Sequence, residues 1–115
     1  MANTFKVITK ANVTSADVIY TVAGSTTTVI LGLVLGNTTT SQVTATVSLA
    51  SDTGSRAGAN NEANQTVELV TNAPIPAGSS LEMLAGNKVV METTDLLKVT
   101  GSGATDVCLS IMEIT

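Results

Sequence analysis

Residues 42–49 read Gln-Val-Thr-Ala-Thr-Val-Ser-Leu, and their strict alternation decides the fold class. Every second residue from Val43 to Leu49 is apolar, and each residue between them carries a hydroxyl group. A period of two places all the apolar side chains on one face of a β-strand, whereas a helix would spread them around its axis. This stretch therefore predicts a strand with one buried face.

The same alternation recurs along the chain and is interrupted by residues that favour turns. Gly, Asn and Ser tolerate positive φ or bond to their own backbone, so they mark the connections. The triplet Ala85-Gly86-Asn87 predicts a hairpin between strands at Ser80–Leu84 and Lys88–Met91. The further alternating stretches are Thr66–Leu69, Ser80–Met83, Leu97–Thr100 and Asp106–Ser110.

Strand signals spaced by about ten residues, without a convincing helix, are typical of sandwiches and barrels. We predict an all-β fold, a single antiparallel β-sandwich of jelly-roll-like form with about eight or nine short strands. No composition shift divides the chain, so residues 1–115 form one domain. The predicted core is Val43, Val47, Leu49, Leu69, Leu81, Met83, Leu97, Val99, Val107, Leu109 and Ile111.

The run Thr28–Leu35 breaks the alternation, because it is apolar on both faces. One interpretation is a central strand that is covered on both sides. The other is that one face contacts a neighbouring subunit, as an apolar excess on a sheet often indicates. Candidate subunit contacts are Val29, Leu31, Leu33 and Leu35, together with Arg56, Asn60 and Asn61 from the long polar segment Asp52–Asn64.

The residue types in the sequence give little support for a catalytic site. The chain has no histidine, which excludes Ser-His-Asp and Cys-His arrangements and the histidine cluster of a cupin metal site. Cys108 alternates with apolar neighbours and has no visible activating partner. A calcium site at Asp52-Thr53 with Asn60 or Asn61 would lack a spaced ligand loop. We expect a protein that is not an enzyme, with no catalytic, cofactor or metal site.

The charge pattern argues against two classes of partner. Five Lys and Arg residues are scattered among nine acidic residues, which gives a net charge of −4 and no basic patch for nucleic acid. The longest apolar run, Val29–Leu35, is far shorter than the roughly 20 residues of a membrane span. The first residues lack the apolar region of a secretory signal, so we expect synthesis in a cytoplasm.

Several motifs carry a resemblance to a known group of proteins. They are Tyr-Thr-Val-Ala-Gly at residues 20–24, Thr-Val-Ile-Leu-Gly-Leu at 28–33, Asn-Thr-Thr at 37–39 and Ala-Pro-Ile-Pro-Ala-Gly-Ser-Ser-Leu-Glu-Met-Leu at 73–84. The chain resembles small virion structural proteins of tailed bacteriophages, of the marine and cyanobacterial type, over nearly its whole length. One departure is Thr94, where such sequences often carry Gly before the Asp.

The resemblance implies a virion structural protein, most often for capsid decoration or cement, that is made in the host cytoplasm. It implies a homo-oligomer, with a trimer favoured, that contacts the major capsid or tail proteins. A tail or neck accessory part, such as a fibre base or adaptor, is the alternative. A module that binds host-surface glycans is an alternative of another class, although Phe5 and Tyr20 are the only aromatic residues it could use.

Overall fold

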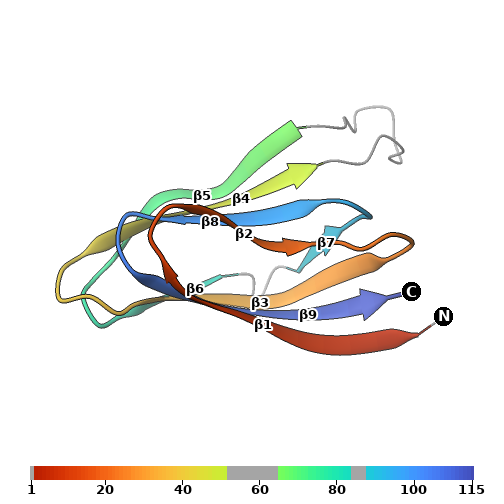
Figure 1. Cartoon of the computed structure of the whole chain (residues 1–115), viewed down its shortest axis with the longest axis horizontal. Coiled ribbons are helices and arrows are strands. Elements are labelled where there is room, and N and C mark those ends of the chain that lie inside the picture. Colours follow the sequence, from red (N-terminus) through yellow and green to blue (C-terminus); the bar gives the residue numbers. More distant parts are fainter. Residues whose placement is uncertain (1, 52–64, 84–87) are drawn as a thin grey trace.

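The computed structural model describes residues 2–51, 65–83 and 88–115, and the structural statements below concern these residues. They form nine strands and no helix, in two antiparallel sheets packed face to face (Figure 1). The predicted all-β sandwich is therefore confirmed. The strands are β1 (Asn3–Val13), β2 (Ala16–Thr21), β3 (Thr27–Asn37), β4 (Val43–Ser51), β5 (Gln65–Ile75), β6 (Ser80–Met83), β7 (Val89–Met91), β8 (Leu96–Gly101) and β9 (Thr105–Ile114).

The strand order is that of a jelly roll. The first sheet has the order β1-β9-β3-β6, with β7 also paired to β3, and the second sheet has the order β2-β8-β4-β5. Strands from the two halves of the chain pair antiparallel, β1 with β9, β2 with β8 and β4 with β5. With β6 and β7 counted as two parts of one interrupted edge strand, this gives the eight strands of a jelly roll.

The predicted hairpin between β6 and β7 is wrong. Strand β6 pairs with the second half of β3, at Leu33–Gly36, and β7 pairs with its first half, at Thr28–Ile30. Because both are antiparallel to β3, they run in the same direction and do not face each other. A Gly-Asn turn signal marks a break in a strand as readily as a reversal, and residues 85–87 lie outside the described residues.

The core lies between the sheets, as the alternation predicted. Seven predicted core residues are buried, and Leu49, Leu69, Leu81 and Met83 are partly buried and pack against them. The seven are Val43, Val47, Leu97, Val99, Val107, Leu109 and Ile111. The structure adds Val13, Val22, Ile30, Leu33, Leu35, Ala45, Ile75 and Met91.

Strand β3 is central in the first sheet and contains a β-bulge between Ile30 and Gly32. After the bulge, Leu33 and Leu35 point into the core and are 1% and 0% exposed. The expectation that these two leucines contact another subunit is therefore wrong. The outward side of the strand instead carries the half-buried Val29 and the exposed Val34.

A buried asparagine fixes the connection between β3 and β4. The Asn37 amide donates hydrogen bonds to the carbonyls of Ser41 at 2.8 Å and Ile75 at 2.9 Å. Its oxygen accepts from the backbone N–H and the hydroxyl of Thr39, at 2.9 and 2.8 Å. Both donors and both acceptor positions of the amide are used, so the side chain is buried without an unpaired group.

No helix among the described residues could span a membrane.

Candidate assembly surface

The outer face of the first sheet presents an apolar row that crosses four strands. The pairing register aligns Phe5 of β1 with Met112 of β9, Val29 of β3 and Val90 of β7. Phe5 is 71% exposed, the largest exposed fraction among the large hydrophobic residues, and Val90 is also exposed. Residues aligned across antiparallel strands share one face, so these four side chains form a continuous ridge.

Two further rows lie beside this ridge. The middle row joins Val7, Ser110 and Gly32, and the third row joins Thr9, Cys108, Val34 and Glu82. Around the third row is an open hollow of about 340 Å³, which Gly36 helps to create because it has no side chain. The hollow is lined by Thr9, Lys10, Ala11, Val34, Gly36, Asp106, Val107 and Cys108. The face thus combines a ridge and a hollow.

Charged side chains are almost absent from these three rows, in which Glu82 is the one charged residue. The lysines of β1 alternate with Phe5 and Val7 and therefore belong to the opposite, inner side of the strand. There Lys6 forms a 2.7 Å ion pair with Glu113, and Lys10 lies 3.5 Å from the Asp17 carboxylate of β2. The Glu113 ion pair holds the Lys6 ammonium on the inner side, whereas Lys10 is paired with Asp17 and also contributes to the lining of the outer hollow.

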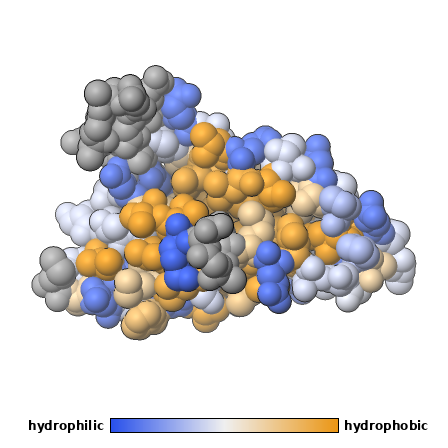
Figure 2. Space-filling view, turned by 180° about the vertical axis from the view of Figure 1, so that it is seen from behind, coloured by the Kyte–Doolittle hydropathy of each residue, from blue (hydrophilic) through white to orange (hydrophobic). Residues whose placement is uncertain are grey.

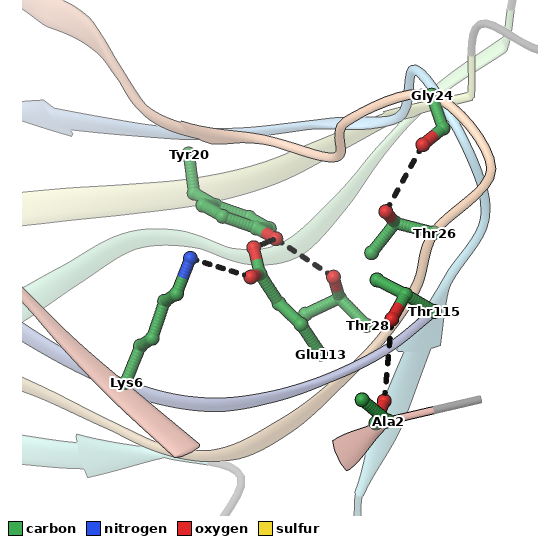
Figure 3. A network of polar contacts seen from close by, with 8 residues as sticks. All are labelled: Ala2, Lys6, Tyr20, Gly24, Thr26, Thr28, Glu113 and Thr115. Carbon is green, nitrogen blue, oxygen red and sulfur yellow. Dashed lines mark hydrogen bonds and ion pairs between the residues drawn. The ribbon is translucent and has the colours of Figure 1, made fainter. Parts of the chain in front are cut away.

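A polar cluster joins the two sheets at the end of the sandwich where β1 begins (Figure 3). The Tyr20 phenol contacts the Glu113 carboxylate at 2.5 Å and the Thr28 hydroxyl at 2.7 Å. Burial, followed by the hydrogen bond to Glu113, raises the pKa of Tyr20 to about 12. Hydrogen bonds from Lys6 and then Tyr20 lower the pKa of Glu113. The cluster is a brace between sheets and leaves the carboxylate fully partnered.

The candidate contacts from the sequence divide into three groups. Val29 is part of the outer ridge, and Leu31 lies half-buried at the bulge. Leu33 and Leu35 belong to the core. Arg56, Asn60 and Asn61 lie outside the described residues. Sequence reasoning missed Phe5 and Val7, although their alternation with Lys6 was the signal that could have identified an exposed apolar face.

Chemistry-bearing residues are dispersed in the part of the chain that the structure describes. Within these ranges, no three Cys, Asp or Glu residues gather where they could hold a metal ion. Cys108 is a free, exposed cysteine in the outer hollow. Neither observation identifies a reaction centre among the described side chains.

A second apolar area lies on the side bordered by edge strands β5, β6 and β7. Figure 2 views the molecule from this side and shows hydrophobic atoms at the surface across its middle. Partly buried residues of these strands that pack against the core include Leu69, Leu81, Met83 and Val89. These residues extend the core towards the surface, whereas the ridge on the first sheet is separate from the core.

No protein-family model and no curated protein matches the sequence. Two solved structures are similar in fold. A chain of the Bacillus endospore appendages, described as disulfide-linked pili, has 18% identity and a TM-score of 0.45, with 96% of this chain and 85% of that chain covered. A chain of the T13 IBDV viral particle has 10% identity and a TM-score of 0.50, with 96% and 35% covered. This chain therefore spans about a third of the viral-particle chain, and the likeness is one of fold.

Proposed function

We propose that the protein is a non-enzymatic structural component of a bacteriophage virion, a capsid decoration or cement protein that acts as a homo-oligomer. The observation that carries this proposal is the exposed, nearly uncharged ridge on the outer face of the first sheet. A monomer gains nothing from exposing aligned apolar side chains on four strands, whereas a subunit can bury them in a contact.

The fold supports the same proposal. Jelly rolls recur in viral capsid domains, and the viral-particle chain shares this fold with the present chain. The Asn37 network ties the β3–β4 connection to the carbonyl of Ile75, and the Tyr20 network joins the two sheets, which suits a part that must present a fixed surface. The complete absence of histidine weighs against an enzyme, since histidine is the commonest general base.

Two alternatives remain as proposals with their own tests. A tail or neck accessory part would use the same surface, so it differs in location and not in chemistry. One observation favours a glycan-binding module: the Phe5 ring is exposed on the outer face, and sugar rings stack on aromatic faces. A glycan array that detects binding by the native chain, with loss in Phe5→Ala, would favour this module.

The decisive experiment is the analysis of purified particles of the phage that encodes the chain. Mass spectrometry of gradient-purified virions should find the chain at a fixed ratio to the major capsid protein. Separated heads and tails then assign it to the capsid or to the tail. Absence of the chain from intact particles, with the chain abundant in the lysate, would overturn the proposal.

Deletion of the gene separates cement from decoration. Particles that lack a cement protein should release their DNA at a lower temperature than wild-type particles, and the native protein added back should restore the difference. Unchanged heat release would mean that the protein decorates the capsid without stabilising it.

A further inference from the structure

We propose that the outer face of the first sheet docks against the same face of a second copy, with Phe5 of each chain seated in the hollow around Cys108 of the other. This inference rests on the proposed structural role, and it names the surface and the partner. A self-complementary contact of this kind has two-fold symmetry.

The spacing of ridge and hollow fits such a contact. Phe5 and Thr9 lie four residues apart on the same face of β1, which corresponds to about 13 Å along the strand. The row of Val7 and Ser110 runs midway between them. Consider a two-fold axis that runs along this middle row, between the two facing sheets. It places the ridge of each copy against the hollow row of the other, and the middle rows of the two copies against each other.

The shapes of the two exchanged rows are complementary. The ridge ends in the most exposed large side chain. The lining of the hollow opposite includes the small residues Thr9, Ala11 and Gly36, together with the charged residues Lys10 and Asp106. The middle row is low at Gly32, which contributes no side chain, whereas Val7 is exposed at its β1 end. An aromatic ring buried in such a hollow contributes the kind of anchor that dominates protein interfaces.

The charge distribution also favours a second copy as the occupant. Two chains of net charge −4 repel each other, so a contact between them is favoured where few charges lie. The outer face carries two carboxylates, Glu82 in the third row and Asp106 beside the hollow, and Oδ1 of Asp106 accepts the Asn12 N–H at 3.0 Å. Exchange of the rows places Glu82 opposite Val90 of the copy instead of opposite a second Glu82. At the strand β6–β7 edge this carboxylate stays at the rim of the contact, where it can remain hydrated.

The size of the face is sufficient for a stable pair. The described residues of its strands number 11 in β1, 10 in β9, 11 in β3, 4 in β6 and 3 in β7. At about 3.4 Å by 4.8 Å for each residue they give roughly 640 Å² per chain. Two such faces bury roughly 1,300 Å², within the range of about 1,200–2,000 Å² for specific interfaces. A two-fold contact produces pairs or higher even-numbered assemblies, and it differs in this respect from the trimer that the sequence resemblance favoured.

Cross-linking tests the position of the axis. In a Cys108→Ser background, Val7→Cys places a thiol on the axis, so mild oxidation with glutathione should convert most of the protein to a disulfide-linked dimer. The matched control is Val18→Cys in the same background, because Val18 is exposed on β2 of the second sheet. Val18→Cys should remain monomeric on a denaturing gel. Equal cross-linking of both variants would overturn the proposal.

Light scattering at several concentrations tests the hollow. The native chain should be a dimer, and Gly36→Val should weaken pairing at least tenfold by filling the hollow. The nearest atom to an added Cβ at Gly36 is the Asp106 carbonyl oxygen at 4.0 Å, so the variant should fold. Phe5→Ala, at an exposed position, should weaken pairing as well. Circular dichroism checks the fold of both variants.

A native chain that is monomeric or trimeric at every concentration would overturn the docking proposal. Particle analysis separates this failure from failure of the proposed function. If the chain is a monomer but is found in virions, only the docking proposal is contradicted. If it is a dimer but is absent from virions, only the proposed virion role is contradicted.

Discussion

The Tyr20 phenol donates a 2.5 Å hydrogen bond to Oε2 of Glu113, and this bond joins a strand of each sheet. Tyr20 comes from β2 in the second sheet and Glu113 from β9 in the first. Lys6 of β1 holds the other carboxylate oxygen at 2.7 Å, and Thr28 of β3 contacts the phenol. Four strands therefore meet in one polar cluster at this end of the sandwich.

The first prediction concerns alkaline pH. The chain has one tyrosine and no tryptophan, so tyrosinate absorbance reports Tyr20 alone. It should rise near pH 12 in the folded protein and near pH 10 in urea, because the folded-state pKa is raised to about 12. The raised pKa contributes stability that is complete below pH 10 and is lost as pH rises through 12. Folded protein that titrates at pH 10 would contradict the brace.

The Tyr20→Phe variant tests the same bonds at neutral pH. It keeps the ring and removes the hydroxyl that contacts Glu113 and Thr28. The free energy of unfolding should fall by about 1–3 kcal/mol, the range for a hydrogen bond to a charged group that leaves a partner unsatisfied. Urea denaturation measures the change, and a value near zero would show that the bonds are not made in solution.

Acidic pH should also weaken the Tyr20–Glu113 brace, because it protonates Glu113. Hydrogen bonds from Lys6 and then Tyr20 lower the pKa of Glu113, so this carboxylate contributes stability above its unfolded pKa of 4.5. The contribution is lost as pH falls through the lower folded-state pKa. Glu113→Gln should therefore flatten the acid limb of a plot of unfolding free energy against pH. Combined with Lys6→Met, it should give less than the sum of the two single losses, and simple additivity would contradict the coupling.

Two adjacent residues of β3 should respond oppositely to the same change. Leu33 is buried in the core, so Leu33→Asp buries an unpaired charge and should leave no folded protein. Val34 is exposed on the outer face, so Val34→Asp should fold normally and lose pairing. Circular dichroism and light scattering distinguish these outcomes. Two folded variants or two unfolded ones would contradict the register after the bulge.

Thr94 occupies a backbone conformation that a β-branched residue disfavours, with φ at 71°. Glycine adopts this conformation without strain, so Thr94→Gly should raise the free energy of unfolding by about 1 kcal/mol. The 3.0 Å hydrogen bond from its backbone N–H to the Val22 carbonyl remains possible in the variant. Thr93→Gly is the control and should destabilise, because the Thr93 hydroxyl donates to the Thr26 carbonyl at 3.0 Å.

The fold class was accessible from the sequence because alternation is a local property. Residues 43–49 show which side chains share a face, and burial of Val43 and Val47 follows from that pattern alone. The choice of partner strand depends on residues far away in the chain. This is why β6 and β7 were expected to pair with each other, whereas both pair with β3.

The outer face was harder to predict for a related reason. A single bulge between Ile30 and Gly32 changes which residues of β3 face outward. Gly32 permits a bulge or a close approach, but the glycine alone does not determine which of these occurs. The exposure of Phe5 and Val7 depends on the inward direction of Lys6, which is fixed by Glu113 at the far end of the sequence. The Phe5-Lys6-Val7 alternation is visible in the sequence, but it does not show which side faces outward. That depends on Glu113, the partner of Lys6.

The pairing of β1 with β9 also determines when a newly made chain can fold. The first strand of the sandwich to be translated, β1, pairs from Asn3↔Ile114 to Lys10↔Val107 with the last strand of the sandwich, β9. At about 5–20 residues per second, translation of the intervening chain keeps β1 without its neighbour for roughly 5–20 seconds. During this wait Lys6 has not yet met Glu113. We expect the unpaired charges of Lys6 and Lys10 to disfavour association between nascent β1 strands, because like charges on an exposed strand oppose edge-to-edge pairing.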